Sequence, residues 1–363
     1  MLREMGLPKP YADSQPLEVI ELELAPPGPG ELLIKVGAAG LCHSDLSVID
    51  GSRPRVMPMV LGHEAAGEVV DTGGETPGFT AGDHVVLSFV PTCGQCGPCR
   101  TGRAALCEPG AAANAAGTLL GGGRRWDAPF HHHLGVSAFA EHVVVSARSA
   151  VKVDPELPYD IAALFGCAVL TGVGAAVNSA QVQPEDRVVI FGLGGVGLAA
   201  LLGAKLAGAS EVVAVDVVEE KLEHARALGA TPIHAGESAV EAIREITGGG
   251  GEKVIETVGS AYVLGQAYEA TRRGGTTVTV GLPDPEQRLD IQAVSLVTEE
   301  RTLKGSYLGS CVPHRDIPHF IEAYKNGDLP VQELLTHRIG LDEINEGFDR
   351  LAAGAAVRQA VIL

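Results

Sequence analysis

The sequence of 363 residues predicts an α/β fold, with a doubly wound parallel sheet and a second, β-rich domain. Three observations lead to this prediction. Apolar runs alternate with helical segments from residue 187 to 280, as they do in parallel sheets. A glycine-rich turn follows the first of these runs. Residues 17–90 look β-rich, with short segments separated by proline and glycine turns.

The glycine-rich turn has the G-x-G-x-x-G spacing of a dinucleotide site. It follows the apolar strand 188–191, places glycine at 192, 194 and 197, and precedes the helical segment 198–207. Gly192 permits a tight turn, Gly194 lets the backbone approach a pyrophosphate, and Gly197 lets helix and strand pack closely. This context favours a Rossmann unit over the alternative, a structural glycine-rich turn.

An acidic residue stands where such a unit needs one. Asp216 ends the second strand, 211–215, and lies 19 residues after Gly197. Its carboxylate can accept hydrogen bonds from both ribose hydroxyls. The same charge repels a 2′-phosphate, and Val217 and Val218 offer no cation to bind one. The sequence therefore predicts NAD rather than NADP as cofactor.

The βα pattern continues beyond Asp216 and then changes character. Strands are expected near 253–257 and 276–280, between helices near 219–228 and 262–272. Later segments look like helices 317–326 and 341–353 and a closing strand 359–363, which we expect to rejoin the first domain. The expected division is 1–168 with 309–363 for the first domain and 169–308 for the Rossmann domain.

The first domain is read as a series of strands and one long loop. Strands are expected at 17–24, 31–36, 65–71, 85–90 and 139–145. Residues 109–137 are rich in alanine and glycine and are predicted to form a surface loop near the pocket mouth. This loop contains His131-His132-His133; consecutive residues do not easily converge on one ion, so we do not predict a metal site there.

Composition excludes several classes of function. The net charge of −18 repels phosphate backbones, so nucleic acid is not an expected partner. No apolar run has membrane length, and the first residues lack the apolar segment of a secretory signal. We expect a cytoplasmic protein with no membrane contact.

Four of the seven cysteines are closely spaced. Cys93, Cys96, Cys99 and Cys107 follow a C-x2-C-x2-C-x7-C pattern. Four thiolates complete a tetrahedral shell and leave no position for water, which predicts a structural zinc. An iron–sulfur cluster is the alternative, but bacterial ferredoxin runs use a shorter final spacing and a following proline. Cys42 and His63 are weak metal signals when each is taken alone.

Several motifs in one order give the chain a family resemblance. They are CHSD at 42–45, GHE at 62–64, the four cysteines, GC at 166–167, GLGGVG at 192–197, VD at 215–216, VG at 280–281, and Arg358. In these motifs the chain resembles the zinc-dependent medium-chain alcohol dehydrogenases, and its long loop resembles the dimeric branches. The resemblance covers nearly the whole chain and implies a GroES-like catalytic zinc domain beside the Rossmann domain.

The resemblance assigns a role to individual residues. Cys42, His63 and Cys167 resemble the ligands of a catalytic zinc with an open fourth position. Asp45 resembles the acid that orients the ligating histidine, Glu64 the acid behind the zinc, and Ser44 the hydroxyl that takes the alcohol proton. Phe89 resembles an aromatic wall of the substrate pocket. The implied NAD contacts are His43, Thr171, Gly192, Gly194, Gly195, Val196, Gly197, Asp216, Lys221, Val280 and Arg358.

The chain departs from the family at two places. Ser47 stands where well-studied members have a histidine that ends a proton relay, so the proton is expected to leave through water or another group. Arg53 and Arg55 stand where the thiol-adduct branch has acidic groups, and Ala111-Ala112-Ala113 opens the loop where that branch has a cation. These departures argue against glutathione-adduct oxidation.

The expected function is reversible hydride transfer between a primary or secondary alcohol and NAD, with one catalytic and one structural zinc per chain. A thiol-adduct (glutathione or mycothiol) formaldehyde dehydrogenase and a specialised biosynthetic carbonyl reductase remain as alternatives. A catalytically silent protein on the same scaffold is a third, although all three catalytic ligands are present. A homodimer is expected from the resemblance, with an edge strand near 289–297 as the pairing surface.

Overall fold

The computed structural model describes residues 1–74, 76–127 and 129–363. The chain forms two compact units. Unit 1 comprises Met1–Cys167, Val312–Ile321 and Val331–Leu363, and unit 2 comprises Ala168–Cys311 and Glu322–Pro330.

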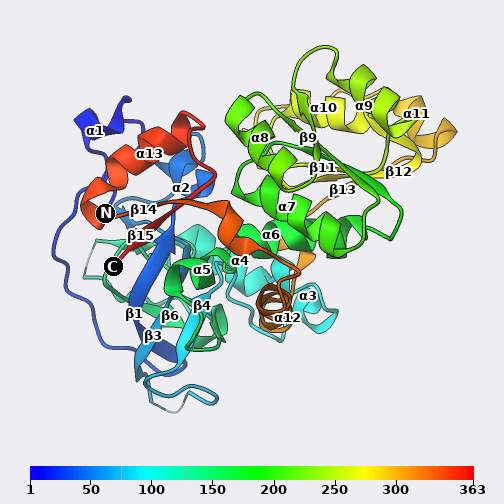
Figure 1. Cartoon of the computed structure of the whole chain (residues 1–363). Helices are drawn as coiled ribbons and strands as arrows, with labels where there is room; N and C mark the ends of the chain where they lie inside the picture. The colour runs from blue at the N-terminus through cyan, green and yellow to red at the C-terminus, as the bar shows by residue number, and fades with distance from the viewer. Residues whose placement is uncertain (75, 128) are drawn as a thin grey trace. The chain divides into compact units, whose positions relative to one another are not determined.

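Unit 1 is built on a seven-stranded sheet (Figure 1). Its strand order is β14-β15-β1-β3-β4-β7, and β6 also pairs with β1. The strands are β1 (Glu31–Gly40), β3 (Glu64–Thr72), β4 (His84–Leu87), β6 (His142–Ser146), β7 (Ala150–Lys152), β14 (Leu335–Ile339) and β15 (Arg358–Ile362). A separate parallel pair joins β2 (Met59–Val60) to β5 (His131–His132).

The helices of unit 1 are mostly short. They are α1 (Tyr11–Ser14), α2 (His43–Ile49), α3 (Gly97–Arg100), α4 (Glu108–Ala116), α5 (Tyr159–Leu164), α12 (Pro313–Lys325, whose last residues belong to unit 2) and α13 (Ile344–Ala352). Helix α13 has apolar residues on one face, and its Phe348 ring meets Phe139 edge-on with ring centroids 6.0 Å apart.

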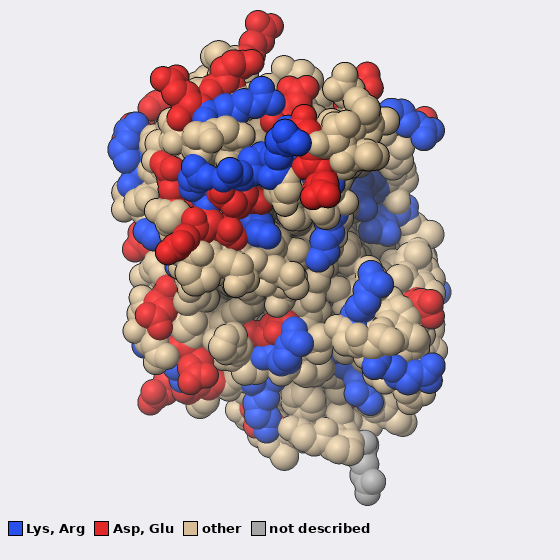
Figure 2. Space-filling model, turned by 90° about the vertical axis from the view of Figure 1, so that its right-hand side faces the viewer, with Lys and Arg blue, Asp and Glu red and all other residues tan. Residues whose placement is uncertain are grey.

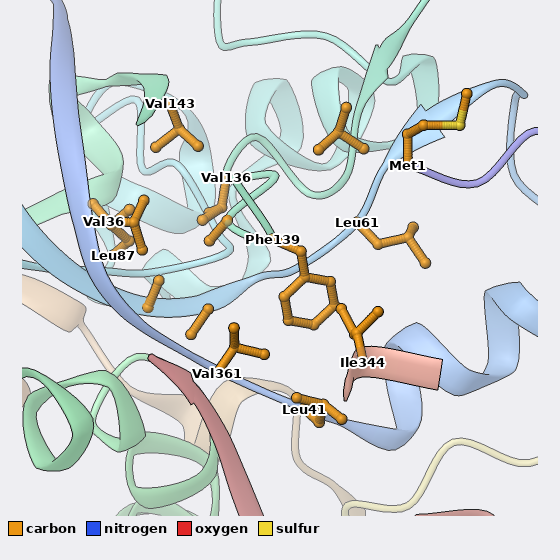
Figure 3. Close-up of a cluster of buried hydrophobic side chains, with 14 of the residues drawn as sticks. Met1, Val36, Leu41, Leu61, Leu87, Val136, Phe139, Val143, Ile344 and Val361 are labelled. Carbon is orange, nitrogen blue, oxygen red and sulfur yellow. The ribbon is translucent and has the colours of Figure 1, made fainter. Parts of the chain in front are cut away.

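The core of unit 1 reaches Leu41, which directly precedes Cys42, and Leu61, which lies two residues before His63. Figure 3 shows Leu41 and Leu61 in one cluster with Phe139, Ile344 and Val361. Leu41 and Leu61 are almost wholly buried, and each such side chain contributes about 1.5–3 kcal/mol through burial. Because Cys42 follows Leu41 directly, core packing fixes the backbone from which the Cys42 side chain projects.

Unit 2 is a six-stranded parallel sheet, which confirms the predicted doubly wound fold (Figure 1). The order β10-β9-β8-β11-β12-β13 places β8 between β9 and β11, where the direction of winding reverses. The strands are β8 (Arg187–Phe191), β9 (Glu211–Asp216), β10 (Thr231–His234), β11 (Gly251–Glu256), β12 (Thr271–Thr279) and β13 (Thr302–Gly305).

Small residues let the helices of unit 2 approach one another. The helices are α6 (Ala168–Gly174), α7 (Gly195–Leu206), α8 (Glu219–Ala227), α9 (Ala239–Thr247), α10 (Ala261–Glu269) and α11 (Ala293–Thr298). A Cβ at Gly203 of α7 would lie 2.8 Å from the Val173 backbone of α6, so only glycine permits this contact.

Three local predictions were wrong. Segment 17–24 has the residue types of a strand, but Leu17 and Leu24 make only isolated bridges, and the segment borders a groove. The predicted loop 109–137 begins with α4, whose alanines favour a helix, and its His131 and His132 form β5. The expected edge strand 289–297 includes the start of α11, because a short apolar run fits either structure.

Surface charge and hydropathy agree with the composition. On the face drawn in Figure 2, acidic and basic side chains are interspersed. Over the described ranges, no helix is both long enough and apolar enough to cross a membrane.

Candidate functional site

Strand pairing brings Cys42 and His63 together. Strands β1 and β3 run antiparallel, and Gly40 at the end of β1 pairs with Glu64 at the start of β3. Cys42 follows β1 by two residues, and His63 immediately precedes β3. Two positions that are 21 residues apart in sequence therefore meet at one edge of the sheet.

Cys167 reaches the same edge after α5. The next strand, β4, pairs Leu87 with Ala65, and Gly166 packs on the carbonyl of Leu87, where a Cβ would come within 2.4 Å of the oxygen. Cys167 Sγ lies 3.5 Å from His63 Nε2. The ligand atoms of Cys42, His63 and Cys167 all lie within 4.8 Å of one another, and the three side chains are buried.

The donor set fits zinc. A hydrogen bond from Cys167 and the positive charge of Arg358 hold the pKa of Cys42 well below its usual range. The same hydrogen bond and burial raise the pKa of Cys167, and a bound cation would favour the thiolate form of both cysteines. Two thiolates and one imidazole are the protein ligands of catalytic zinc sites that keep a fourth position open.

Asp45 holds the other nitrogen of His63. Its carboxylate lies 3.1 Å from His63 Nδ1 and accepts a hydrogen bond from the backbone N–H of Gly62 at 3.1 Å. Burial opposes ionisation of Asp45, but the charge of His63 and hydrogen bonds from His63 and His133 lower its pKa to about 2. Asp45 therefore stays ionised and accepts from Nδ1–H of His63, so Nε2, which lies toward Cys167, is the nitrogen that a metal would take in place of a proton.

Glu64 and Arg358 form a buried ion pair beside the cluster. Arg358 donates to Glu64 Oε2 at 2.9 Å and to the carbonyl of Leu41 at 2.9 Å. A Cβ at Gly40 would lie 2.1 Å from Glu64 Oε1, so the glycine leaves the space that Glu64 fills. The Glu64 charge raises the pKa of Arg358 despite its burial, which keeps a cation next to Cys42.

The remaining predicted residues of unit 1 lie around these ligands. Ser44 is half-buried and His43 exposed at the start of α2. The Phe89 ring meets the His63 ring edge-on at 5.4 Å. Ser47 donates its hydroxyl to the carbonyl of His43 at 2.8 Å, so this side chain supports the helix.

The four clustered cysteines form a separate site. Their sulfur atoms lie within 4.8 Å of one another, and Cys93 and Cys99 are 4.0 Å apart. A tetrahedron with Zn–S bonds of about 2.3 Å needs sulfurs about 3.8 Å apart. Hydrogen bonds from the backbone N–H groups of Gln95 and Cys96 lower the pKa of Cys93 to about 6, which favours the ligating thiolate.

In unit 2 the three motif glycines have different surroundings. Gly192 has φ +88°, a conformation that side chains disfavour. A Cβ at Gly197 would lie 1.8 Å from the Gly192 carbonyl oxygen, whereas Gly194 has open space around it. Gly194 is the N-cap of α7, which begins at Gly195, and the first N–H groups of a helix have no partner within that helix.

Asp216 is positioned against the same turn. It accepts from the backbone N–H of Leu193 at 2.6 Å and of Val218 at 3.0 Å. Lys221 lies in the first turn of α8, which follows β9. Thr171 is buried in α6, Val196 lies in the first turn of α7, and Val280 follows β12.

Sequence reasoning missed two residues. Thr257 follows β11 and donates to the carbonyls of Phe191 and Gly192, both at 3.0 Å, so it fixes the glycine turn at the point where winding reverses. Its place after an apolar strand was the available signal. His133 is buried, with Nδ1 3.0 Å from Asp45, although the predicted surface loop placed it outside.

Known proteins resemble the chain over nearly its full length. Residues 28–155 match the alcohol dehydrogenase GroES-like domain, and residues 195–326 match the zinc-binding dehydrogenase family. An S-(hydroxymethyl)glutathione dehydrogenase of Escherichia coli (strain SMS-3-5 / SECEC) is 36% identical over 360 residues, which cover 97% of each protein.

Solved structures give the same result. A benzyl alcohol dehydrogenase from Acinetobacter calcoaceticus is 34% identical, with a TM-score of 0.91 and 95% of each chain covered. An alcohol dehydrogenase zinc-binding domain protein from Burkholderia ambifaria is 34% identical, with a TM-score of 0.93, and covers 99% of this chain and 97% of its own. The chain therefore belongs to the zinc-dependent medium-chain alcohol dehydrogenase family and is an NAD-dependent oxidoreductase.

Proposed function

We propose that unit 1 oxidises primary or secondary alcohols at a zinc held by Cys42, His63 and Cys167, and that unit 2 binds the NAD that accepts hydride. The convergence of two thiols and one imidazole in a buried cluster carries this proposal, because three protein ligands leave a fourth position for substrate. Bound zinc acts as a Lewis acid toward the alcohol oxygen, and NAD supplies the hydride acceptor.

The protein's own groups have distinct parts in this proposal. Ser44 relays the alcohol proton: its hydroxyl oxygen accepts that proton while its own hydroxyl proton passes to water. The phenyl ring of Phe89 excludes water beside His63. Asp45 fixes the tautomer of His63. The ion pair with Glu64 holds the positive charge of Arg358 next to Cys42. The roles of His43 and Arg358 as cofactor contacts stay predictions.

The glycine turn and Asp216 are the proposed NAD site of unit 2. Gly194 offers open backbone to the pyrophosphate, Gly195 begins the helix whose first N–H groups would bind it, and Gly192 and Gly197 shape the turn. Asp216 selects NAD, because its carboxylate accepts from ribose hydroxyls and repels a 2′-phosphate. Thr171, Val196 and Val280 are the proposed nicotinamide contacts, and Lys221 is the proposed neighbour of the adenosine ribose.

A second candidate is oxidation of the formaldehyde adduct of a thiol such as glutathione. The 36% identity to an S-(hydroxymethyl)glutathione dehydrogenase favours it. Arg53 and Arg55 count against it, since the resembling branch has acidic groups at that place. A specialised carbonyl reductase would use the same parts in reverse.

The test is NADH formation by purified holoenzyme with alcohols of graded chain length and aromaticity, and with formaldehyde in the presence and absence of glutathione or mycothiol. Oxidation of simple alcohols without a thiol supports the main proposal. Activity that requires formaldehyde and a thiol favours the second, and absence of NADH formation from every alcohol contradicts the first.

We further propose a cytoplasmic homodimer. Strand β13 lies at the edge of the unit 2 sheet, and the nearby Val294 and Val297 are exposed, which suits pairing of two copies. Seven free cysteines in the structure suit a reducing compartment. Light scattering after gel filtration tests the dimer, and cell fractionation tests the location; a monomer or a secreted protein would contradict them.

A further inference from the structure

His133 is a buried imidazole that no step of the proposed reaction uses. Its Nδ1 lies 3.0 Å from Asp45 Oδ1, and the two side chains are 1% and 0% exposed. Its ring meets the His63 ring at 88° with centroids 5.4 Å apart. The Asp45 carboxylate therefore lies at hydrogen-bonding distance from two imidazoles.

The three consecutive histidines have three different environments. His131 Nδ1 lies 3.1 Å from the carbonyl of Pro58, and His132 Nε2 accepts from the backbone N–H of Arg125 at 3.1 Å. These two contacts hold the loop. His133 alone of the three faces Asp45, so a structural role for the loop does not account for an imidazole at this position.

The backbone around His133 is bound to the segment that carries His63. Ala138 and Phe139 donate their N–H groups to the carbonyls of Gly62 and Leu61, both at 3.0 Å. A Cβ at Gly62 would lie 2.6 Å from Phe139 N, so the two segments are as close as glycine permits. The His133 loop and the His63 segment therefore keep a fixed spacing.

The turn after His133 has a costly conformation. Leu134 and Ser137 have φ values of +51° and +59°, which side chains rarely adopt. The hydroxyl of Ser137 accepts from the backbone N–H of His133 at 2.8 Å, and the backbone N–H of Ser137 donates to the carbonyl of His133 at 3.2 Å. Strain of this kind persists where the surrounding structure fixes a side chain in place.

A buried carboxylate is stable only when its lone pairs find donors. The N–H of Gly62 and Nδ1 of His63 supply two donors to Asp45, each at 3.1 Å. Nδ1 of His133 lies 3.0 Å from Asp45 Oδ1 and has no other hydrogen-bond partner among the described residues, so the tautomer with a proton on Nδ1 places a third donor beside the carboxylate.

We propose that His133 is a positioning residue, whose Nδ1–H holds Asp45 in the orientation that presents Nε2 of His63 to the catalytic zinc. This inference rests on the proposed role of His63 as a zinc ligand. Groups that orient a ligating histidine typically change metal affinity about 10- to 100-fold when they are removed.

The test measures zinc release from purified holoenzyme into an excess of a chromogenic chelator. His133→Phe keeps a ring without a donor, whereas His133→Asn places an amide N–H where Nδ1 stood. His133→Gln has a longer side chain, which places its amide beyond the position of Nδ1. His132→Gln is the control, because it alters a neighbouring buried histidine that does not contact Asp45 among the described contacts. The zinc of the four cysteines serves as an internal reference, assigned with Cys96→Ser.

We expect His133→Phe and His133→Gln to release one zinc about 10- to 100-fold faster. The other zinc of these two variants should leave at the rate of the unsubstituted enzyme. His133→Asn and His132→Gln should release both zincs at that rate. Unchanged release from His133→Phe would overturn the inference, as would equal acceleration of both zincs. A third zinc per chain that His133→Phe removes would also overturn it, since His133 would then be a ligand. If the enzyme holds two slowly released zincs but oxidises no alcohol, the proposed function fails while this inference stands.

Discussion

The two thiol clusters of unit 1 differ in how the chain builds them. Cys93, Cys96, Cys99 and Cys107 come from one 15-residue segment, are supported by backbone N–H groups and are half-exposed, except for Cys107. Cys42, His63 and Cys167 span 126 residues of sequence and are buried. The local cluster is a closed set of four donors, whereas the distant set has three donors and depends on strand register.

The two clusters are therefore suited to different tasks, one to stability and the other to catalysis. Four thiolates saturate an ion, so the local cluster can stabilise its lobe but offers no position to substrate. The three-donor cluster offers that position, and it depends on surrounding groups such as Asp45 and Arg358 to set charge and orientation. Substitutions should therefore affect the two clusters in different ways.

The largest expected effect is on activity, from His63→Ala. This change removes one of three zinc ligands, and loss of the metal's several kcal/mol of charge stabilisation should lower kcat/KM by about 10³-fold or more. The zinc content should fall by one per chain while the four-cysteine zinc stays. Steady-state kinetics and elemental analysis check both, and near-normal activity would contradict the assignment.

The next effect is on stability, from Cys96→Ser. Structural zinc contributes folding free energy outright, with apparent values of about 10–16 kcal/mol in isolated zinc-finger peptides and less where a folded domain supports the site. We expect loss of one zinc, a lower thermal midpoint and proteolysis within the segment around 93–107. The surviving fraction should retain alcohol oxidation per catalytic zinc. A variant with normal stability would argue against a structural site.

A matched pair of glycine substitutions tests how each cluster depends on its surroundings. Gly62 has φ +94° and abuts the Phe139 backbone, so Gly62→Ala should cost about 1–3 kcal/mol and weaken zinc binding at His63. Gly97 has open space around it, so Gly97→Ala should stay within about 1 kcal/mol. Urea unfolding and zinc release measure both. Equal effects at the two positions would remove the contrast.

The smallest expected effect lies in unit 2. The carboxylate of Asp216 accepts hydrogen bonds from the backbone N–H groups of Leu193 and Val218. Asp216→Asn removes its negative charge and should raise KM for NAD about tenfold, which corresponds to about 1.4 kcal/mol. Both zincs should remain, since Asp216 is not among the proposed zinc ligands. The ratio of kcat/KM for NAD to that for NADP reports the change, and an unaltered ratio would reject Asp216 as the selector.

Local signals made much of this molecule predictable from sequence. The glycine turn, Asp216 and the four cysteines are each encoded within a short segment, and their geometry agrees with the spacing. The three-ligand cluster was predicted from a family resemblance, because its assembly depends on the pairing of Gly40 with Glu64, which local spacing does not reveal.

What sequence reasoning missed is non-local in the same way. His133 was placed on a surface loop because its segment is rich in alanine and glycine, but backbone bonds from residues 138 and 139 to residues 61 and 62 draw it into the core. Segment 17–24 alternates like a strand, but its described residues find only isolated bridges. In both cases a partner elsewhere in the chain decided the outcome.

The zinc content of active enzyme separates a catalytic zinc from a structural one. We expect two zincs per chain in the unsubstituted enzyme and one in each of His63→Ala and Cys96→Ser, with alcohol oxidation retained only by Cys96→Ser. One zinc per chain in fully active enzyme, or alcohol oxidation by zinc-depleted His63→Ala, would contradict this expectation.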